Sequence, residues 1–299
     1  MTTAAPPVAA NPAAEAASRR RRRVPYYLLA PGLIYLLVLY VIPLVGLVRM
    51  ALQTGNLAAG YTFNWAWENF AQVFTTYRPQ LLRSLGYSLG ATIITLLLSY
   101  PLAYAIAFRT GRYKNIFLVL LLMPFLVPFL LRTLAWRLIL ADQGVVVETL
   151  KTIGILPQQG GRLLATGWAV IAGLVYSFLP FMTLPIYVAL EKIDRSMLEA
   201  ANDLYARPAT AFWKVTWPLS LPGVISGTLL TAIPAAGDYI NVQLLGNPQG
   251  TMMGNVIDNK FLSSIDYPAA AALSITLMLA IVLPVIFYIR AVGTEELVT

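Results

Sequence analysis

Residues 196–219 read SMLEAANDLYARPATAFWKVTWPL, a polar and charged island between two long apolar segments. Apolar residues recur in it at i, i+3, i+4 and i+7, which predicts one apolar stripe along a short helix. The stripe consists of Met197, Ala200, Ala201 and Leu204. Ser196 followed by Glu199 matches a capping box, in which each side chain satisfies an amide of the first turn. We therefore predict that this helix begins at Ser196.

Pro208 predicts both the end of this helix and the start of a second one. The residue before a proline disfavours the helical conformation, whereas proline itself suits the first turn of a helix. We expect the second helix to run to about Thr216 and to stop at Pro218. Two short helices joined at a bend between apolar segments indicate a contact with something outside the bilayer.

The composition places the chain in a membrane. Of its 299 residues, 58% are hydrophobic and 11% are charged, whereas soluble domains carry about 25% charged residues. The absence of cysteine excludes disulfides and thiolate metal sites, and the absence of histidine removes the commonest general base. We expect neither a cofactor nor a metal. The net charge of +8 includes the arginine run at 19–23, directly before an apolar segment. Such a run indicates membrane topology and contact with lipid headgroups rather than nucleic acid.

Six apolar stretches are long enough to cross a bilayer, which takes about 20 residues each. They lie at about 25–48, 85–108, 116–140, 166–190, 222–245 and 268–290. Residues 1–24 are predicted to be a disordered basic tail and 291–299 a C-terminal tail. Residues 53–82 are predicted to be an external loop anchored by tryptophans, and 145–153 an amphipathic helix.

The distribution of basic residues sets the orientation. Cytoplasmic loops carry an excess of Lys and Arg, and this excess is obtained when the N-terminus is inside. The cytoplasmic segments then hold residues 19–23, Arg109, Arg112, Lys114, Lys192, Arg195, Arg207, Lys214 and Arg290. The island at 196–219 therefore faces the cytoplasm.

Within that island, Glu199-Ala200-Ala201 followed by Phe212, Val215, Pro218 and Leu219 resembles the EAA loop of permease subunits of bacterial ABC importers. In that family the loop, here about 191–219, forms coupling helices that dock on a separate ATP-hydrolysing subunit. The docking residues that the resemblance implies are Glu199, Ala200, Ala201, Leu204, Tyr205, Phe212 and Trp213. The family usually has glycine at the position of Tyr205, where it ends the helix in a left-handed turn. Because tyrosine adopts that turn only at a cost, we expect the bend to rely on Pro208.

Two further regions, 128–136 and 237–257, resemble the spermidine/putrescine branch of these permeases. They contain Pro128 to Trp136, Gly237-Asp238-Tyr239, Leu244-Leu245-Gly246 and Met253 to Ile257. The resemblance implies an all-α membrane protein, a six-span permease domain (25–290) of the type I ABC importer kind, in the bacterial cytoplasmic membrane. It also implies half of a translocation path for polyamines. The implied partners are two copies of a cytoplasmic ATP-binding subunit, a second homologous permease and an extracytoplasmic binding protein. The chain has no GxxxxGK[ST] run, so we do not expect it to hydrolyse ATP itself.

Asp238 is the one acidic residue inside a predicted span, where an unpaired carboxylate costs about 2.5–3.5 kcal/mol. A polyamine path needs carboxylate, amide oxygens and aromatic faces, and an ammonium over an aromatic ring gains about 0.5–2 kcal/mol. Residues of these types are Asp238, Tyr239, Asn241 and Trp136. An alternative is that Asp238 pairs with Arg132 and locks the third span to the fifth. Arg132 could instead indicate an anionic cargo such as sulfate, phosphate or molybdate.

Other interpretations remain open at this point. The cargo could be another small solute such as an inorganic anion, iron or thiamine. An ion-driven secondary transporter would usually need coupling carboxylates or histidines and inverted repeats, which a single acidic residue and no histidine disfavour. A membrane scaffold for an enzyme partner is the third class, and it would bind an ATPase without cargo-dependent turnover.

Overall fold

The computed structural model describes residues 28–158 and 160–292. Within these residues five helices are long and apolar enough to cross a membrane, and a bent pair of helices gives a sixth span if it is counted as one. The chain divides into two units, residues 1–50 and 51–299. The predicted basic tail 1–24 lies outside the described residues, as does the predicted C-terminal tail beyond residue 292.

The first unit contains one apolar helix. Leu28–Ala51 is long enough to span a bilayer and crosses the unit boundary only with its last residue. Its middle is a π-helical turn, Leu37–Val41, which continues directly into α2, Ile42–Ala51. The helix agrees with the first predicted span, displaced by a few residues.

The second unit opens with a β-hairpin that the sequence did not predict. Strand β1 (Gln53–Asn56) pairs antiparallel with β2 (Gly60–Phe63). Gly55 has a φ of +126°, and a Cβ there would lie 2.0 Å from the Gly60 carbonyl oxygen, so only glycine fits. Helices α3 (Glu68–Thr75) and α4 (Arg78–Phe108) follow. The predicted loop at 53–82 is therefore largely ordered, and the second span begins before residue 85.

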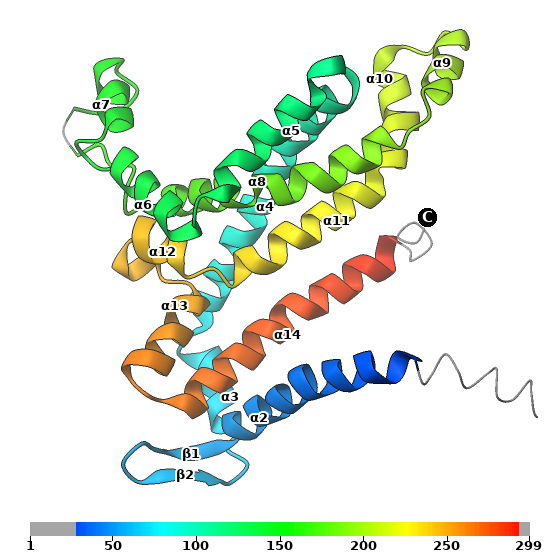
Figure 1. The fold of residues 1–299 in the computed structure, drawn as a ribbon. Coiled ribbons are helices and arrows are strands. Elements are labelled where there is room, and N and C mark those ends of the chain that lie inside the picture. Colours follow the sequence, from blue (N-terminus) through cyan, green and yellow to red (C-terminus); the bar gives the residue numbers. More distant parts are fainter. Residues whose placement is uncertain (1–27, 159, 293–299) are drawn as a thin grey trace, which may run out of the picture. The chain divides into compact units, whose positions relative to one another are not determined.

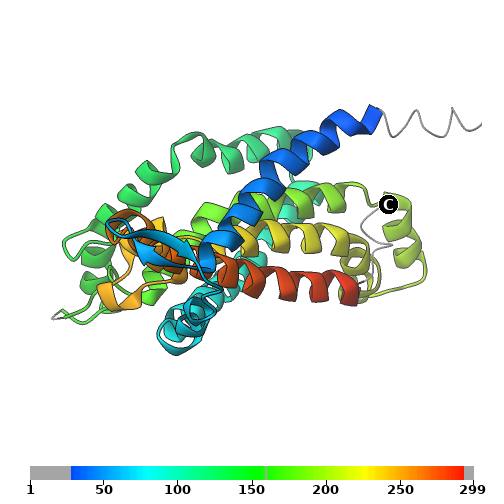
Figure 2. The same ribbon diagram turned by 90° about the horizontal axis from the view of Figure 1, so that it is seen from below.

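Three long helices form the centre of this unit (Figure 1). Helices α4, α8 (Gly167–Glu191) and α11 (Trp217–Ala236) pack against one another. Helices α8 and α11 approach closely at Gly223 and Gly227, four residues apart on α11. A Cβ would lie 2.5 Å from the Pro185 carbonyl oxygen at Gly223 and 2.9 Å from that of Met182 at Gly227. Small residues at this spacing let membrane helices approach closely, and both views show the two helices side by side (Figure 2).

The predicted third span is not one straight helix. Helix α5 (Lys114–Leu122) ends in a 3₁₀ turn, Met123–Leu126, and α6 (Phe129–Ile139) follows after a bend of 91°. The cause is Pro128, because the residue before a proline avoids the helical conformation. Val127 is extended, with φ −82° and ψ 134°. The continuous span predicted at 116–140 is therefore wrong in this detail.

The predicted fifth span, 222–245, is also two elements. Helix α11 ends at Ala236, and the short helix α12 (Ile240–Leu245) packs on α6 and α8 instead of extending the span. Two further short helices are α7 (Val145–Thr152) and α13 (Met253–Asp258), and a π-helical turn, Asn259–Ser263, follows α13. The last helix, α14 (Tyr267–Val292), packs on α3 and α13. Helices α7, α8 and α14 agree with their predicted ranges.

Candidate functional site

Residues 195–216, called the coupling segment after their predicted role, begin with a helix whose first residue lies one position earlier than predicted. Helix α9 spans Arg195–Asp203, and the Ser196 backbone N–H donates to Oδ1 of Asp194 at 3.0 Å. Asp194 thus supplies the side-chain cap, and the predicted capping box of Ser196 with Glu199 is wrong. Aspartate serves because its short carboxylate reaches the free amides of the first turn. The backbone and side-chain hydrogen bonds from Ser196 hold the pKa of Asp194 below its ordinary value.

Tyr205 ends α9 in a left-handed turn. Its φ is +56°, and the Ala206 N–H donates to the Ala201 carbonyl at 3.0 Å, which is the bond that closes a Schellman motif. The expectation that the bend avoids this turn and relies on Pro208 is therefore wrong. A residue with a Cβ pays about 1–2 kcal/mol in this conformation. The coupling segment thus keeps the turn geometry that glycine favours, but holds it with a strained tyrosine.

The α9 surface is free of contacts that would bury it. None of the α9 side chains that the structure describes is buried, including Glu199 and Ala200, and Ala201 is half-buried. Beyond the helix, Leu204 is exposed and Tyr205 is 96% exposed. Apolar side chains that project together from one helical segment mark an interaction surface. The α9 segment therefore presents exposed polar and apolar side chains together.

The second helix of the coupling segment continues into the long α11. Helix α10 (Pro208–Ala211) leads through a π-helical turn, Phe212–Thr216, directly into α11. The predicted stop at Pro218 is wrong, because Pro218 lies in the first turn of α11, where proline is tolerated. Residues Pro208–Ala236 form one helix of spanning length. Helix α10 is therefore continuous with α11, without an intervening loop.

Phe212 and Trp213 point to different surroundings. The Phe212 ring lies 5.7 Å from Tyr100 and 6.3 Å from Tyr104, both on α4, and 6.4 Å from Trp217. Trp213, in contrast, is 62% exposed. Phe212 thus anchors the coupling segment to α4 of its own chain, and Trp213 remains available to a partner.

A break between α11 and α12 forms the second candidate site. Asp238 in this break is only 8% exposed. Its Oδ1 accepts from the Asn241 backbone N–H at 2.8 Å, and its Oδ2 accepts from Asn241 Nδ2 at 3.2 Å. Asn241 is itself buried. The Asp238 carboxylate is thus occupied in holding the first turn of α12.

Arg132 does not form the predicted ion pair with Asp238. The described residues contain three ion pairs, and none of them involves either residue. The buried Arg132 guanidinium lies 5.4 Å from the Phe125 ring centroid and 5.8 Å from that of Phe129. Its Nε has no hydrogen-bond partner in the part of the chain that the structure describes. A cation–π contact therefore replaces the ionic lock.

The remaining predicted path residues lie in different cavities. Trp136 packs edge-on against Tyr176, with ring centroids 5.4 Å apart, and lines an apolar cavity of about 400 Å³. Tyr239 is 39% exposed and lines another cavity, of about 300 Å³. The structure therefore does not gather Asp238, Tyr239, Asn241 and Trp136 around one space.

The two sequence motifs at 237–239 and 253–257 are in contact in the structure. The Asn255 side chain on α13 donates from Nδ2 to the Tyr239 carbonyl at 2.9 Å. Gly254 lies so close that a Cβ there would be 2.8 Å from the Gly237 carbonyl oxygen. The Met253 N–H donates to Ser84 Oγ on α4 at 2.7 Å, which fixes α13 in place. The same helix carries Asp258, which sequence reasoning missed because it lies between two predicted spans.

The fold, the exposed coupling segment and the helix break define an integral membrane permease. Residues 99–291 match the model of the family described as binding-protein-dependent transport system inner membrane component. This is more than half of the chain, so the chain belongs to that family of ABC transporter permeases, which are multi-pass proteins of the bacterial inner membrane.

Two of the relatives that the chain resembles are named spermidine/putrescine transport system permease protein PotB. The chain is 42% identical to the Haemophilus influenzae protein over 161 residues, or 54% of this chain and 56% of the relative. It is 39% identical to the Escherichia coli protein over 161 residues, or 54% of this chain and 58% of the relative. The matches thus span only a little over half the length of these relatives.

A solved structure supports the fold. A chain of a bacterial ABC transporter that imports the acidic polysaccharide alginate superposes with a TM-score of 0.65. The superposition covers 90% of this chain and 94% of that chain at 18% identity. The predicted all-α fold of the type I ABC importer permease is confirmed.

Proposed function

We propose that this chain is one membrane subunit of an ATP-driven importer and forms half of a translocation path for polyamines such as spermidine and putrescine. The observation that carries the proposal is the identity of about 40% to two permeases named for these cargoes. The domain bounds predicted from the sequence, 25–290 with tails at 1–24 and 291–299, belong to this proposal.

The partners follow from the same assignment. Two copies of a separate cytoplasmic subunit bind and hydrolyse ATP, a second homologous permease supplies the other half of the path, and an external protein delivers cargo. The N-terminus lies in the cytoplasm, in agreement with the basic residues at 19–23 and around the coupling segment. The exposed α9 surface at Glu199, Ala200 and Tyr205 supports docking of the ATP-binding subunit there.

The geometry suggests how ATP-driven closure reaches the membrane. A force on α9 passes through the turn at Tyr205 to α10, which is continuous with α11. Phe212 ties the same segment to α4 through Tyr100, whose hydroxyl is 2.8 Å from Ser220 Oγ of α11. Close packing transmits displacement because buried side chains have little free volume. Helices α4, α8 and α11 thus move together and change the side of the membrane to which the translocation path is open.

A second candidate cargo is an anion. Arg132 is buried, and its Nε lacks a hydrogen-bond partner among the described residues. A buried guanidinium whose donor is unsatisfied is costly unless a ligand or partner completes it. An anionic cargo would do so, and the experiment below separates the two classes.

The test is cargo-dependent ATPase activity of the complete complex in vesicles with its external binding protein. Spermidine and putrescine should stimulate hydrolysis, and sulfate, phosphate and molybdate should not. Stimulation by an anion alone would refute the polyamine cargo and retain the importer.

The docking role is tested with Glu199→Lys combined with Ala201→Asp. These changes reverse one charge and add another on the exposed helix, so copurification of the ATP-binding subunit and cargo-stimulated hydrolysis should fall at least about tenfold. Glu148→Lys, on the exposed surface of α7, is the matched control and should leave both unchanged. Normal assembly and stimulation in the double variant would show that α9 does not dock the ATPase.

A further inference from the structure

Two cavities beside the helix break share one acidic residue. The larger has a volume of about 500 Å³, and its wall includes Asn247, Asn255 and Asp258. The smaller has a volume of about 300 Å³ and lies against the break at Gly237 and Tyr239. Asp258, at the end of α13, lines both. Asp258 therefore borders both spaces.

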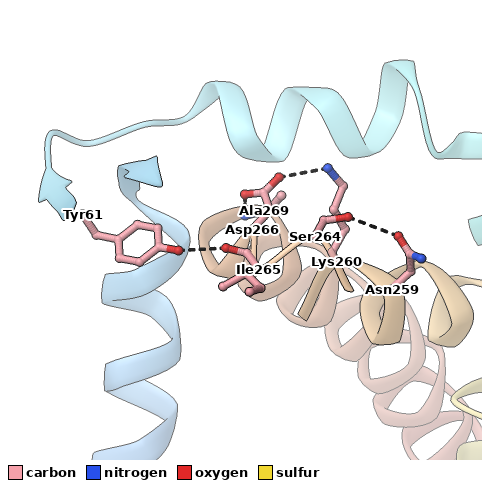
Figure 3. A network of polar contacts seen from close by, with 7 residues as sticks. All are labelled: Tyr61, Asn259, Lys260, Ser264, Ile265, Asp266 and Ala269. Carbon is pink, nitrogen blue, oxygen red and sulfur yellow. Dashed lines mark hydrogen bonds and ion pairs between the residues drawn. The ribbon is translucent and has the colours of Figure 1, made fainter. Parts of the chain in front are cut away.

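The only other charged residue of the larger cavity wall, Lys260, is already paired with a carboxylate. Lys260 Nζ donates to Asp266 Oδ2 at 2.9 Å, as Figure 3 shows. This hydrogen bond raises the pKa of Lys260, so the ammonium stays charged and paired. Asp266 in turn accepts the Ala269 N–H at the start of α14, which fixes its position. Asp258 takes no part in the three ion pairs of the described residues. Asp258 is therefore a carboxylate of the cavity wall that no ion pair of the described residues neutralises.

The surroundings of Asp258 suit an alkylammonium group. Tyr239 and Phe261 line the smaller cavity, and both rings are partly exposed. Aromatic faces attract an ammonium, and aliphatic carbons also pack against them. On the larger cavity, Oδ1 of Asn247 is buried and lacks a hydrogen-bond donor within the described residues. A carboxylate, two aromatic rings and a free amide oxygen are the groups that bind an amine joined to an apolar chain.

Asp238 is not available to bind an alkylammonium group. Its two oxygens already accept the backbone and side-chain N–H groups of Asn241, and it is buried. A cargo ammonium at Asp238 would have to displace both bonds. Asp258 offers the same charge without that cost.

We propose that Asp258 is the cargo-binding carboxylate of this chain and receives a primary ammonium group of the polyamine, with Tyr239 and Phe261 flanking the adjacent methylene carbons. The inference rests on the proposed importer function and names the residue that gives the path its preference for cations. It assigns Asp238 to the structure of the break rather than to the cargo.

The first test compares Asp258→Asn with Asp142→Asn in the complete complex with its binding protein. Asp142 is an exposed carboxylate that pairs with Arg162 at the surface, so its variant controls for loss of a negative charge. Asp258→Asn should raise the spermidine concentration for half-maximal ATPase stimulation about tenfold to a hundredfold, because a hydrogen bond to a charged group is lost. The control should not change it. Unchanged stimulation in Asp258→Asn would overturn the assignment, whereas a wild-type complex that polyamines do not stimulate would instead refute the proposed function.

The second test does not depend on turnover, and it decides the matter if Asp258→Asn fails to assemble. The chain contains no cysteine, so Asp258→Cys introduces a single thiol. A cationic methanethiosulfonate reagent should label this thiol in the complex, and mass spectrometry of this chain measures the labelling. Because Asp258→Cys lacks the carboxylate, spermidine is used at about a hundredfold the concentration that saturates the native complex. It should then slow the labelling at Asp258→Cys about tenfold and leave Asp142→Cys unaffected. Labelling that spermidine does not slow, in a complex that spermidine stimulates, would overturn the proposal.

Discussion

Replacing Tyr205 with glycine should strengthen the turn that ends α9. Tyr205 has a φ of +56° at a position where a residue with a Cβ pays about 1–2 kcal/mol. Glycine removes that cost but adds about 0.4–1 kcal/mol of unfolded-state entropy. The net gain is about 0.5–1 kcal/mol. This corresponds to a shift of roughly twofold to fivefold in the equilibrium between the closed and the open turn.

The assay is hydrogen exchange of the Ala206 amide, whose bond to the Ala201 carbonyl closes the turn at 3.0 Å. Exchange in Tyr205→Gly should be about twofold to fivefold slower than in the native chain. Tyr205→Ala is the control, because alanine keeps the strain and loses only the exposed ring. Its exchange should match that of the native chain. Equal or faster exchange in the glycine variant would refute the strain, and slower exchange in both variants would attribute the effect to the ring.

Two further predictions concern packing and pH. Gly227→Leu should destabilise the isolated chain by about 1–3 kcal/mol, because a Cβ there would lie 2.9 Å from the Met182 carbonyl oxygen. Thermal unfolding in detergent measures this loss of stability. Gly86→Leu is the control and should not destabilise the chain, because no atom lies within 4 Å of a Cβ at Gly86. The start of α9 should lose hydrogen-exchange protection at Ser196 only in acid. The pKa of Asp194 is lowered in the folded state, so its cap stabilises above the unfolded value of about 3.9 and is lost as the pH falls through the lower folded value. Asp194→Asn should abolish this pH dependence, and a dependence that persists in the variant would show that another group causes it.

The coupling segment and the two cavities lined by Asp258 are linked through helix α11. The Tyr205 turn leads to α10 and α11, and α11 ends at the break that carries Asp238 and Tyr239. Helix α13 is tied to that break by Asn255. A shift of α11 would therefore change the relation between the break and Asp258. In the proposed importer, this would connect ATP-driven movement at one end of α11 with the proposed cargo carboxylate Asp258 at the other.

The membrane class, most of the spans and the position of the coupling segment are readable from the sequence. Their signals are local: runs of apolar residues, a short amphipathic stripe from Met197 to Leu204, and prolines that restrict their neighbours. Each such signal depends on residues within a few positions of one another. For this reason helices α8 and α14 lie where periodicity and composition predict them.

The sequence predictions that proved wrong are those at positions where two local conformational preferences compete. Glycine is the usual residue in a left-handed turn, yet Tyr205 adopts that turn because the Ala206 to Ala201 bond and the following helix compensate its strain. Pro218 does not end α10, because its missing N–H falls in a first turn that needs no partner. Asp194 outcompetes Ser196 for the cap because its carboxylate reaches the Ser196 amide.

What the sequence determined by itself is therefore the kind of protein: a mostly helical membrane permease with a polar segment between two of its spans. Only the tertiary structure decided which charged groups are free. Asp238 and Arg132 lie in neighbouring elements, but one bonds to Asn241 and the other faces phenylalanine rings. Asp258 lines two cavities only because α13 folds back onto the break through Gly254 and Asn255. The availability of a charge depends on contacts between residues far apart in the chain, and no local pattern encodes those contacts.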